Sequence, residues 1–350
     1  MSNLWCDGFG RYGGVKANML NGSSGQAWAA VGDDFGLSTA NPRTGTHHLR
    51  MYSNLQNPAR RVIGEPKTEL FWGFAIFCHA LPAAEGDNGI CFRIKDQANT
   101  TQIYIMLGTD GALEARRNGE TLARSIPIIG AGAYQHVEIY ARASETDGAI
   151  EVRVDEITRL SLTGIRTTTS SNISFSQVEF WPGTFAPYPV IDFADVYVND
   201  AVNDGSGCHT FIGDCKSGWL EVDADTAQAD FTLSAGSDGF ALLGTPPDDA
   251  TFIDTDATTA ESNFALEDGP ANLSEILTVR PAVRAQKDDA GTALIAPSLK
   301  SNSVKAAIDG QPITSAFAYY DANVPLNPDT SAPWTLAELN AALHVVERVE

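Results

Sequence analysis

The sequence predicts an all-β protein whose N-terminal part is an antiparallel sandwich. Three observations support this fold class. Apolar and polar residues alternate over many short segments, as in half-buried strands. Turn sequences such as Thr-Asp-Gly at 109–111 and Asn-Gly at 118–119 separate these segments. No long segment shows helical periodicity.

The strands expected in the first 200 residues can be assigned in order. Residues 69–81 form an apolar run rich in aromatic side chains, and residues 90–96 alternate more regularly after the turn sequence PAAEGDNG. Residues 101–123 contain two strands joined by the Thr-Asp-Gly turn. The remaining predicted strands are AYQHVEIYARAS, GAIEVRVDEI, ISFSQVEFW and VIDFADVYV. Short strands with regularly spaced turns are typical of a sandwich.

The second half has less regular strand patterns and one helix signal. The expected strands, separated by loops rich in Asp, Thr and Pro, are GWLEVDA, FALLG, EILTVRPAVRA, GTALIAPSLKS and SAFAYYDANV. Thr335 is followed three residues later by Glu338, which is the spacing of a capping box. We therefore expect a short helix there, followed by a final strand over HVVERV.

Charge divides the chain into two parts. Residues 1–200 carry 16 Lys and Arg against 21 Asp and Glu, whereas the last 150 residues carry 7 against 23. A chain of 350 residues also suits two domains. We expect a sandwich domain over 1–202, a glycine-rich link over 203–210, and an acidic, mostly β domain over 211–350.

Composition argues against nucleic acid and membranes as partners. The net charge of −21 offers no basic footprint for nucleic acid or for an anionic membrane. No run is long and apolar enough for a membrane helix, and the N-terminus lacks the pattern of a secretory signal. The five cysteines lack CxxC spacing, so free thiols are expected. Cys78 and Cys91 flank an expected hairpin, where they either face each other or serve as small core residues.

Several of these segments together resemble a known family. They are WCDGFGRYG near the start, TGTHHLRM at 44–51, FADVYVND at 193–200, FIGD at 211–214 and PWTLAELNAALHVVERV at 333–349. In this order they resemble structural proteins of tailed-bacteriophage virions that carry a concanavalin-A/laminin-G-like jelly roll. The resemblance implies a jelly roll closed by 195–200, with 211–214 opening the next strand.

The resemblance also implies a function. The protein would be a non-enzymatic head or tail component, assembled in the host cytoplasm and located in the virion. Its partners would be copies of itself and other virion proteins, with a host-surface glycan as a further partner. The alternative is a lectin-like module that recognises a host-surface glycan.

Metal binding has weak support in the sequence. Asp200, Asp204 and Gly205 match positions one, five and six of a calcium loop, but Val202 and Phe211 occupy two positions that need oxygen ligands. The Asp and Asn residues are therefore interpreted as turn residues. No metal site and no cofactor are expected.

Catalysis also has weak support. A glycosidase needs two carboxylates at a fixed separation. Glu151 and Asp155 would share a strand face, but Arg153 lies between them. Asp192 and Asp195 are three positions apart and would point to opposite faces. The histidines suggest no partner set, and no G-x-S-x-G elbow occurs. We expect no enzyme.

One aromatic segment is the candidate contact site. EFWPGTFAPYP, residues 179–189, places Trp181, Phe185 and Tyr188 among prolines. Aromatic rings held in this way could stack on a sugar ring, or they could pack against the second domain or a neighbouring subunit. Both interpretations stay open at this point.

Overall fold

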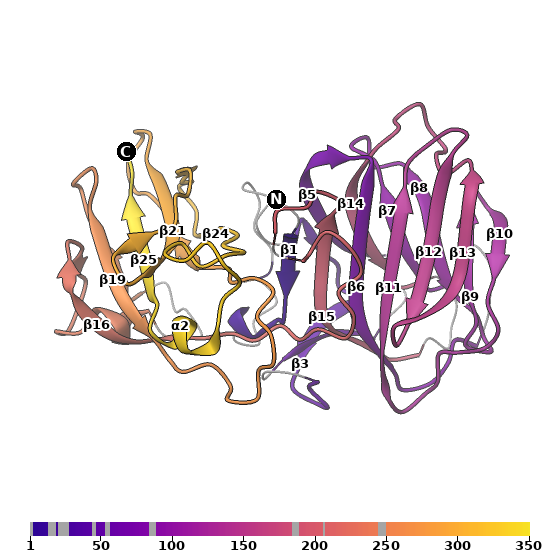
Figure 1. Ribbon diagram of the computed structural model, residues 1–350, viewed down its shortest axis with the longest axis horizontal. Coiled ribbons are helices and arrows are strands. Elements are labelled where there is room, and N and C mark those ends of the chain that lie inside the picture. The colour runs from indigo at the N-terminus through magenta and orange to yellow at the C-terminus, as the bar shows by residue number, and fades with distance from the viewer. Residues whose placement is uncertain are drawn as a thin grey trace.

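A computed structural model describes residues 3–12, 19, 28–43, 47–52, 57–83, 89–183, 189–205, 207–243 and 250–350. Its first part is a sandwich of two antiparallel sheets (Figure 1). One sheet has eight strands in the order β13-β12-β11-β6-β15-β4-β3, with β1 also paired to β15. The other has seven, in the order β10-β9-β8-β7-β14-β5-β2. The predicted all-β class and its N-terminal sandwich are confirmed.

The predicted segments became β6, β7, β8, β9, β11, β12, β14 and β15, whereas β1 to β5, β10 and β13 were not predicted. The eight-stranded sheet consists of β1 (Asn3–Asp7), β3 (Phe35–Ser38), β4 (His48–Met51), β6 (Glu69–Cys78), β11 (Tyr134–Arg142), β12 (Gly148–Val154), β13 (Ile157–Ile165) and β15 (Ile191–Asp200). The seven-stranded sheet consists of β2 (Ala30–Val31), β5 (Ala59–Lys67), β7 (Cys91–Lys95), β8 (Thr101–Leu107), β9 (Leu113–Arg117), β10 (Glu120–Arg124) and β14 (Phe175–Trp181). A 3-10 turn, Gly10–Tyr12, follows β1.

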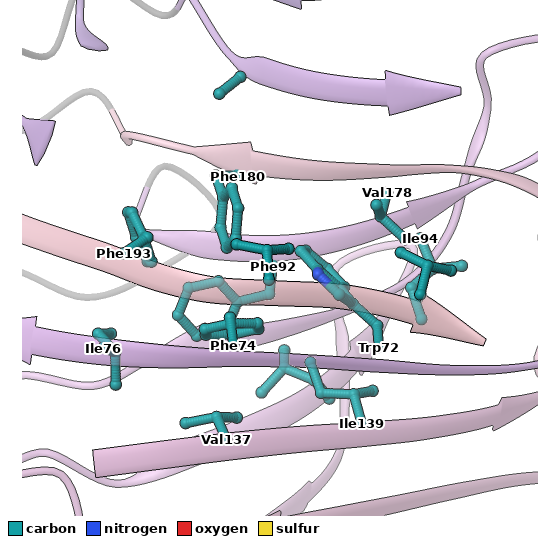
Figure 2. Packing of buried hydrophobic residues seen from close by; sticks show 14 of the residues in the cluster. Trp72, Phe74, Ile76, Phe92, Ile94, Val137, Ile139, Val178, Phe180 and Phe193 are labelled. Atoms are coloured by element: carbon teal, nitrogen blue, oxygen red, sulfur yellow. The ribbon is translucent and has the colours of Figure 1, made fainter. Parts of the chain in front are cut away.

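An aromatic core holds the two sheets together (Figure 2). Trp72 and Phe74 of β6 meet Phe92 of β7 and Phe180 of β14 between the layers. Phe180 also stacks on Phe193 of β15, with ring centroids 4.2 Å apart. Because alternate residues of each strand enter this core, the residues between them point to the outer faces of the sandwich.

The C-terminal half contains a further sheet, separate from the two sheets of the sandwich. A six-stranded sheet comprises β16 (Val222–Ala229), β19 (Glu261–Leu266), β25 (Leu343–Arg348), β21 (Leu294–Ser301), β22 (Val304–Lys305) and β23 (Gln311–Pro312). Two strand pairs accompany it: β17 (Thr232–Leu233) with β18 (Ile253–Asp254), and β20 (Ala282–Ala285) with β24 (Ala318–Asp321).

The predicted C-terminal helix is confirmed. Helix α2 spans Leu336–Asn340, and Thr335 and Glu338 form the complete capping box. Helix α1 is the single turn Gly239–Leu242, so the strand expected over FALLG is wrong. In the part of the chain that the structure describes, no helix has the length and apolarity to cross a membrane.

The segment after β15 crosses the outer face of the eight-stranded sheet. The next strand, β16, begins only at Val222, so the strand implied at 211–214 is wrong. Instead, Phe211 packs against Phe71, with ring centroids 5.1 Å apart, and Arg153 lies 3.8 Å above the Phe211 ring. Buried Glu138 accepts hydrogen bonds from the backbone N–H groups of residues 212 and 213, at 2.9 and 3.0 Å. We call residues 211–217 the strap.

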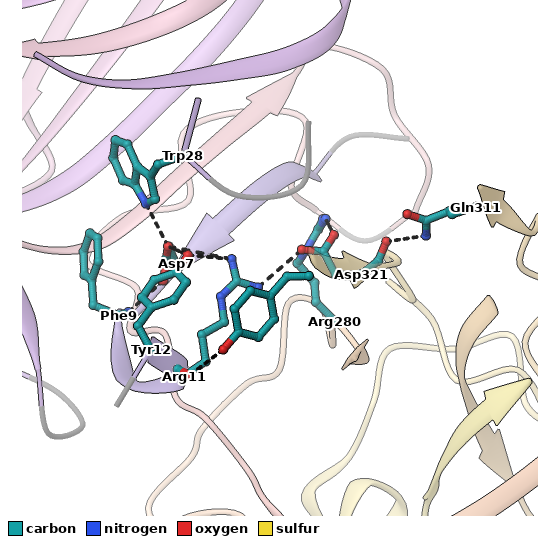
Figure 3. A network of polar contacts seen from close by, with 9 residues as sticks. Asp7, Phe9, Arg11, Tyr12, Trp28, Arg280, Gln311 and Asp321 are labelled. Carbon is teal, nitrogen blue, oxygen red and sulfur yellow. Dashed lines mark hydrogen bonds and ion pairs between the residues drawn. The ribbon is translucent and has the colours of Figure 1, made fainter. Parts of the chain in front are cut away.

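A buried polar network joins the sandwich to the C-terminal half (Figure 3). Asp7 accepts hydrogen bonds from Tyr12 at 2.6 Å and from the Trp28 indole at 3.0 Å. Arg11 lies 3.4 Å from Asp321 of β24, which also pairs with Arg280 at 2.6 Å. These contacts join residues that lie on the two sides of the expected link. The bounds of that link, 203–210, stay a prediction.

Candidate functional site

The three residues of the predicted contact site are only partly covered by the structure. Trp181 is the last residue of β14 and points away from the sandwich core. Phe185 and Tyr188 lie outside the described residues. The candidate site is therefore built around Trp181, on the outer face of the seven-stranded sheet.

Strand register brings the outward side chains of this sheet into rows. Glu179 of β14 lies opposite Arg60 of β5 on one side and Arg93 of β7 on the other. Arg93 lies opposite Tyr104 of β8, which lies opposite Arg116 of β9. Side chains directly opposite each other in an antiparallel pair are about 5 Å apart, so this row is a continuous polar band across the sheet.

A second row, beside the first, begins at Trp181. It continues through Cys91 of β7 and Met106 of β8 to Glu114 of β9. Trp181 packs against the buried cluster of Cys91, Tyr104 and Met106. The guanidinium carbon of Arg93 lies 3.8 Å from the centre of the Trp181 ring, which is a close cation–π contact. The two rows therefore meet at Arg93 and Trp181.

Glu179 fixes the cations of the first row. Its carboxylate lies 3.4 Å from the Arg93 guanidinium and 3.1 Å from the Lys95 ammonium. The Glu179 side chain is 1% exposed, whereas the side chains of Lys95 and Arg93 are 10% and 19% exposed. A buried carboxylate with two cationic partners holds both of them in defined positions. The cations can still present further N–H groups to solvent.

The far end of the two rows repeats this arrangement. Glu114 accepts a hydrogen bond from Arg124 at 2.8 Å and lies 3.6 Å from Arg116. Hydrogen bonds to Asp110 and then to Glu114 raise the pKa of Arg124, so its charge is retained. Arg116 also donates to Thr121 at 3.1 Å.

This face carries an excess of positive charge on a strongly acidic protein. The outward positions described above include the cations Arg60, Arg93, Lys95 and Arg116, and the anions Glu114 and Glu179. The net charge of −21 for the whole chain gives no indication of this local excess of cationic side chains. The face can donate several hydrogen bonds from rigidly held cations beside aromatic and thioether groups.

A second polar cluster, on the outer face of the other sheet, was not predicted. Asp192 of β15 accepts two hydrogen bonds from Arg50, at 2.6 and 2.8 Å, and lies 2.9 Å from His79 and 3.1 Å from His48. Burial raises the pKa of Asp192, but hydrogen bonds from Arg50, His48 and His79 outweigh it and hold the pKa well below its usual range.

The expected opposite orientation of Asp192 and Asp195 is wrong. The register of β15 shifts after Ala194, and Asp195 has a positive φ of 50°. This bulge turns Asp195 outward, where it pairs with Arg43 at 2.8 Å and accepts the N–H of Ser217 in the strap at 2.9 Å. Both carboxylates are paired with arginine side chains, and their role here is structural.

The other catalytic and metal candidates have structural partners. Asp155 lies in the tight turn between β12 and β13, with a φ of 50°, and accepts the N–H of His136 at 2.8 Å. It is not part of a strand row with Glu151, which binds Arg153 at 2.8 Å. Asp200 pairs with Lys67 at 3.0 Å. Within the described ranges, no group of three His, Cys, Asp or Glu residues could hold a metal ion.

The two cysteines of the expected hairpin do not face each other. β6 and β7 belong to different sheets, so no hairpin joins them. Cys78 lies in the aromatic core, where burial raises the pKa of its thiol to about 12, and Cys91 lies in the outward cluster beside Trp181. Both act as small hydrophobic residues.

The chain matches no protein-family model and no curated protein sequence. Several solved structures are similar to about half of this chain. An alginate lyase from Chlorella virus is 14% identical with a TM-score of 0.39, and the match covers 49% of this chain and 93% of that one. A Bacillus subtilis protein with a galectin-like fold is 9% identical with a TM-score of 0.37, over 57% of this chain and 96% of that one.

A sialidase is 15% identical with a TM-score of 0.36, over 51% of this chain and only 17% of the sialidase. At these identities and TM-scores the likenesses carry no functional argument. What the structure itself shows is an all-β protein with a jelly-roll-like sandwich, whose seven-stranded sheet presents a cationic and aromatic outer face.

Proposed function

We propose that this protein is a carbohydrate-binding module and that the outer face of its seven-stranded sheet is the binding surface. The observation that carries the proposal is the contact of Arg93 with both the Trp181 ring and the Glu179 carboxylate. A sugar presents C–H groups on its ring faces and hydroxyl groups at its edge. An aromatic side chain beside fixed hydrogen-bonding groups complements both parts.

The polar groups of this face are held in place before a ligand arrives. Lys95 and Arg93 are positioned by Glu179, and Arg116 is positioned by Thr121 and Glu114. Such pre-organisation lowers the conformational entropy lost on binding, which favours measurable affinity for a small ligand. The excess of cations favours sugars that carry carboxylate or sulfate groups over neutral ones.

The same geometry favours binding over hydrolysis. Glu179 lies on β14 and Glu114 on β9, with β7 and β8 between them. Three strand spacings place the two strands about 14 Å apart, beyond the roughly 5–9.5 Å that paired glycosidase carboxylates require. Each carboxylate is also neutralised by its own cations.

The test is a panel of neutral and acidic oligosaccharides titrated into the purified protein and followed by calorimetry. We expect saturable binding that Trp181→Ala weakens about tenfold or more, equivalent to about 1.4 kcal/mol. Trp219→Ala is the matched control, because Trp219 lies in the segment before β16 and belongs to neither row of this face. No binding across the panel, or an equal effect of the two substitutions, would contradict the proposal.

The virion role that the sequence resemblance implies stays a prediction. A glycan-binding face suits a host-attachment component, in which many weak sites act together through avidity. Antibody-gold labelling of phage particles from a producing culture would test it. A regular label on the head or the tail is expected, and unlabelled particles beside free protein would contradict it.

A further inference from the structure

A small polar pocket lies where the edges of the two sheets meet. It has a volume of about 140 Å³ and is lined by Arg117, Asn118, Glu120, Arg166, Thr168 and Thr169. The first three belong to the hairpin between β9 and β10, in the seven-stranded sheet. The last three follow β13, the edge strand of the eight-stranded sheet. The volume suits a single small group such as a carboxylate, a sulfate or a phosphate.

The two arginines have different surroundings. Arg117 donates to the backbone oxygen of Arg166 at 2.8 Å and to Glu120 at 2.8 Å, so its guanidinium is held against the loop after β13. Arg166 is exposed and forms no ion pair with any residue that the structure describes. The pocket therefore contains one positioned cation and one uncompensated cation, with Glu120 as the only acidic residue of its lining.

Thr168 and Thr169 form a rigid wall of the pocket. Thr168 is fully buried, and its hydroxyl has no hydrogen-bond partner among the described residues. Thr169 is fixed by its hydroxyl, which donates to the Thr101 carbonyl at 2.7 Å, and by its N–H, which donates to Gln102 at 2.7 Å. An unused hydroxyl on a buried side chain is uncommon in a folded protein and often indicates a missing partner.

We propose that this pocket is an oxyanion-binding site, separate from the outer face around Trp181. Arg166 and Arg117 supply the charge, because a guanidinium matches the geometry of a carboxylate, sulfate or phosphate group with two parallel hydrogen bonds. Asn118 supplies a neutral donor, and the buried Thr168 forms part of the pocket wall. Glu120 competes for Arg117, and it leaves readily because its side chain is 62% exposed and exposed ion pairs are weak.

The role of Glu120 gives the proposal a test with two opposite signs. Sodium sulfate, sodium phosphate and methyl glucuronide are titrated separately into the full-length, ¹⁵N-labelled protein at constant ionic strength, and the amide signals of residues 118–120 and 166–169 are followed. We expect saturable shifts confined to these residues. Arg166→Ala should weaken binding about tenfold or more, and Glu120→Gln should strengthen it about threefold, because it removes the competing carboxylate.

The control is Lys216→Ala, which removes one positive charge from an exposed side chain outside the pocket.

The three titrants distinguish the sources of the bound group. Tightest binding of glucuronide identifies a sugar acid, and tightest binding of sulfate or phosphate identifies an inorganic or esterified anion. The proposal is overturned if none of the three shifts these amides at up to about 50 mM. It is also overturned if Arg166→Ala behaves like Lys216→Ala, or if Glu120→Gln weakens binding. Because Trp181 is untouched, these results are independent of sugar binding on the outer face.

Discussion

Arg11 and Asp321 are 310 positions apart in the chain and meet in a buried ion pair at 3.4 Å. Asp321 also pairs with Arg280, and the hydroxyl of Tyr319, two residues earlier, donates to the Arg11 carbonyl at 3.1 Å. Tyr319 itself is part of the sandwich core. The C-terminal half is thus fixed to the sandwich by a buried charge network together with apolar packing. We therefore expect the two halves to unfold as one cooperative unit.

Asp321→Asn should destabilise the whole protein. The substitution leaves the buried cations of Arg11 and Arg280 without their shared carboxylate, and such a loss costs about 3–5 kcal/mol. We expect a large decrease in the free energy of unfolding, measured by urea denaturation, with a single transition for both halves. Asp309→Asn, at an exposed position, is the control and should change stability by less than about 0.5 kcal/mol. A second transition confined to one half would contradict the cooperative unit.

Stability should fall in acid. Burial raises the pKa of Asp321, but Arg280, Arg11 and Arg61 outweigh it and lower the pKa below its usual range. The pKa of Asp192 is lowered by its arginine and histidine partners in the same way. A carboxyl whose folded pKa is depressed stabilises the folded state above its unfolded pKa, about 4, and loses that contribution as the pH falls toward the folded pKa.

Burial also lowers the pKa of His136 to about 3 and that of His344 to about 4, so below about pH 6.5 the unfolded chain binds protons that the folded protein does not. We therefore expect the melting temperature to be nearly constant from about pH 7 to 8, to decrease below about pH 6.5, and to decrease more steeply below about pH 4. Asp192→Asn should reduce the size of this acid decrease, because one of the linked carboxyls is gone. An acid decrease of unchanged size in this variant would show that Asp192 does not contribute to the pH dependence.

The strands with regular alternation were predictable from the sequence because their pattern is local, whereas β5 (Ala59–Lys67) and β13 (Ile157–Ile165) were not predicted. The segment predicted as ISFSQVEFW became β14, Phe175–Trp181, and the run starting at residue 69 became β6, Glu69–Cys78. The capping box at Thr335 is a similar case, since all its hydrogen bonds lie within four residues. Alternation and caps depend on near neighbours, so one sequence contains the information.

The outer face around Trp181 was not predictable in the same way. Glu179 and Lys95 are 84 positions apart, and they meet only because β14 inserts beside β7. Strand order is a tertiary property that alternation does not encode. The outward turn of Asp195 was missed for a different reason: a β-bulge changes which face each later residue occupies, and no glycine marks this one in the sequence. Trp181 was identified from its aromatic surroundings, without its partners.

The strap should loosen when Glu138 is removed. The Glu138 carboxylate accepts two strap N–H groups and the Tyr197 hydroxyl, and all three donors lose their partner in Glu138→Ala. Leaving buried donors unpaired costs about 1–3 kcal/mol each. We expect faster amide exchange at residues 211–215, with little change in β8 or β9. Glu156→Ala, which removes only a 3.5 Å contact to the N–H of Asp214, should leave residues 211–213 protected. Equal exchange in both variants would assign the strap's order to the Phe211 ring contacts instead.

Gly73 should not tolerate a side chain. It lies opposite Tyr197 in the pairing of β6 with β15, and a Cβ atom added to it would lie 2.1 Å from the Tyr197 ring. No real Cβ contact is this short, so Gly73→Ala must displace a ring that is 1% exposed and hydrogen-bonded to Glu138. Overpacking of this kind costs about 1–3 kcal/mol. We expect a lower midpoint of urea unfolding and faster amide exchange in the strap, because the displaced ring disturbs the carboxylate that holds residues 212 and 213.

Gly218→Ala is the matched control for this effect. A Cβ atom at Gly218 would meet nothing within 4 Å, and this glycine has no positive φ in the structure. Its substitution should be neutral or slightly stabilising, because alanine restricts the unfolded chain more than glycine does. If Gly73→Ala unfolds at the same urea concentration as Gly218→Ala, the Tyr197 ring can move without cost. The link from β6 through Tyr197 and Glu138 to the strap would then have to be abandoned.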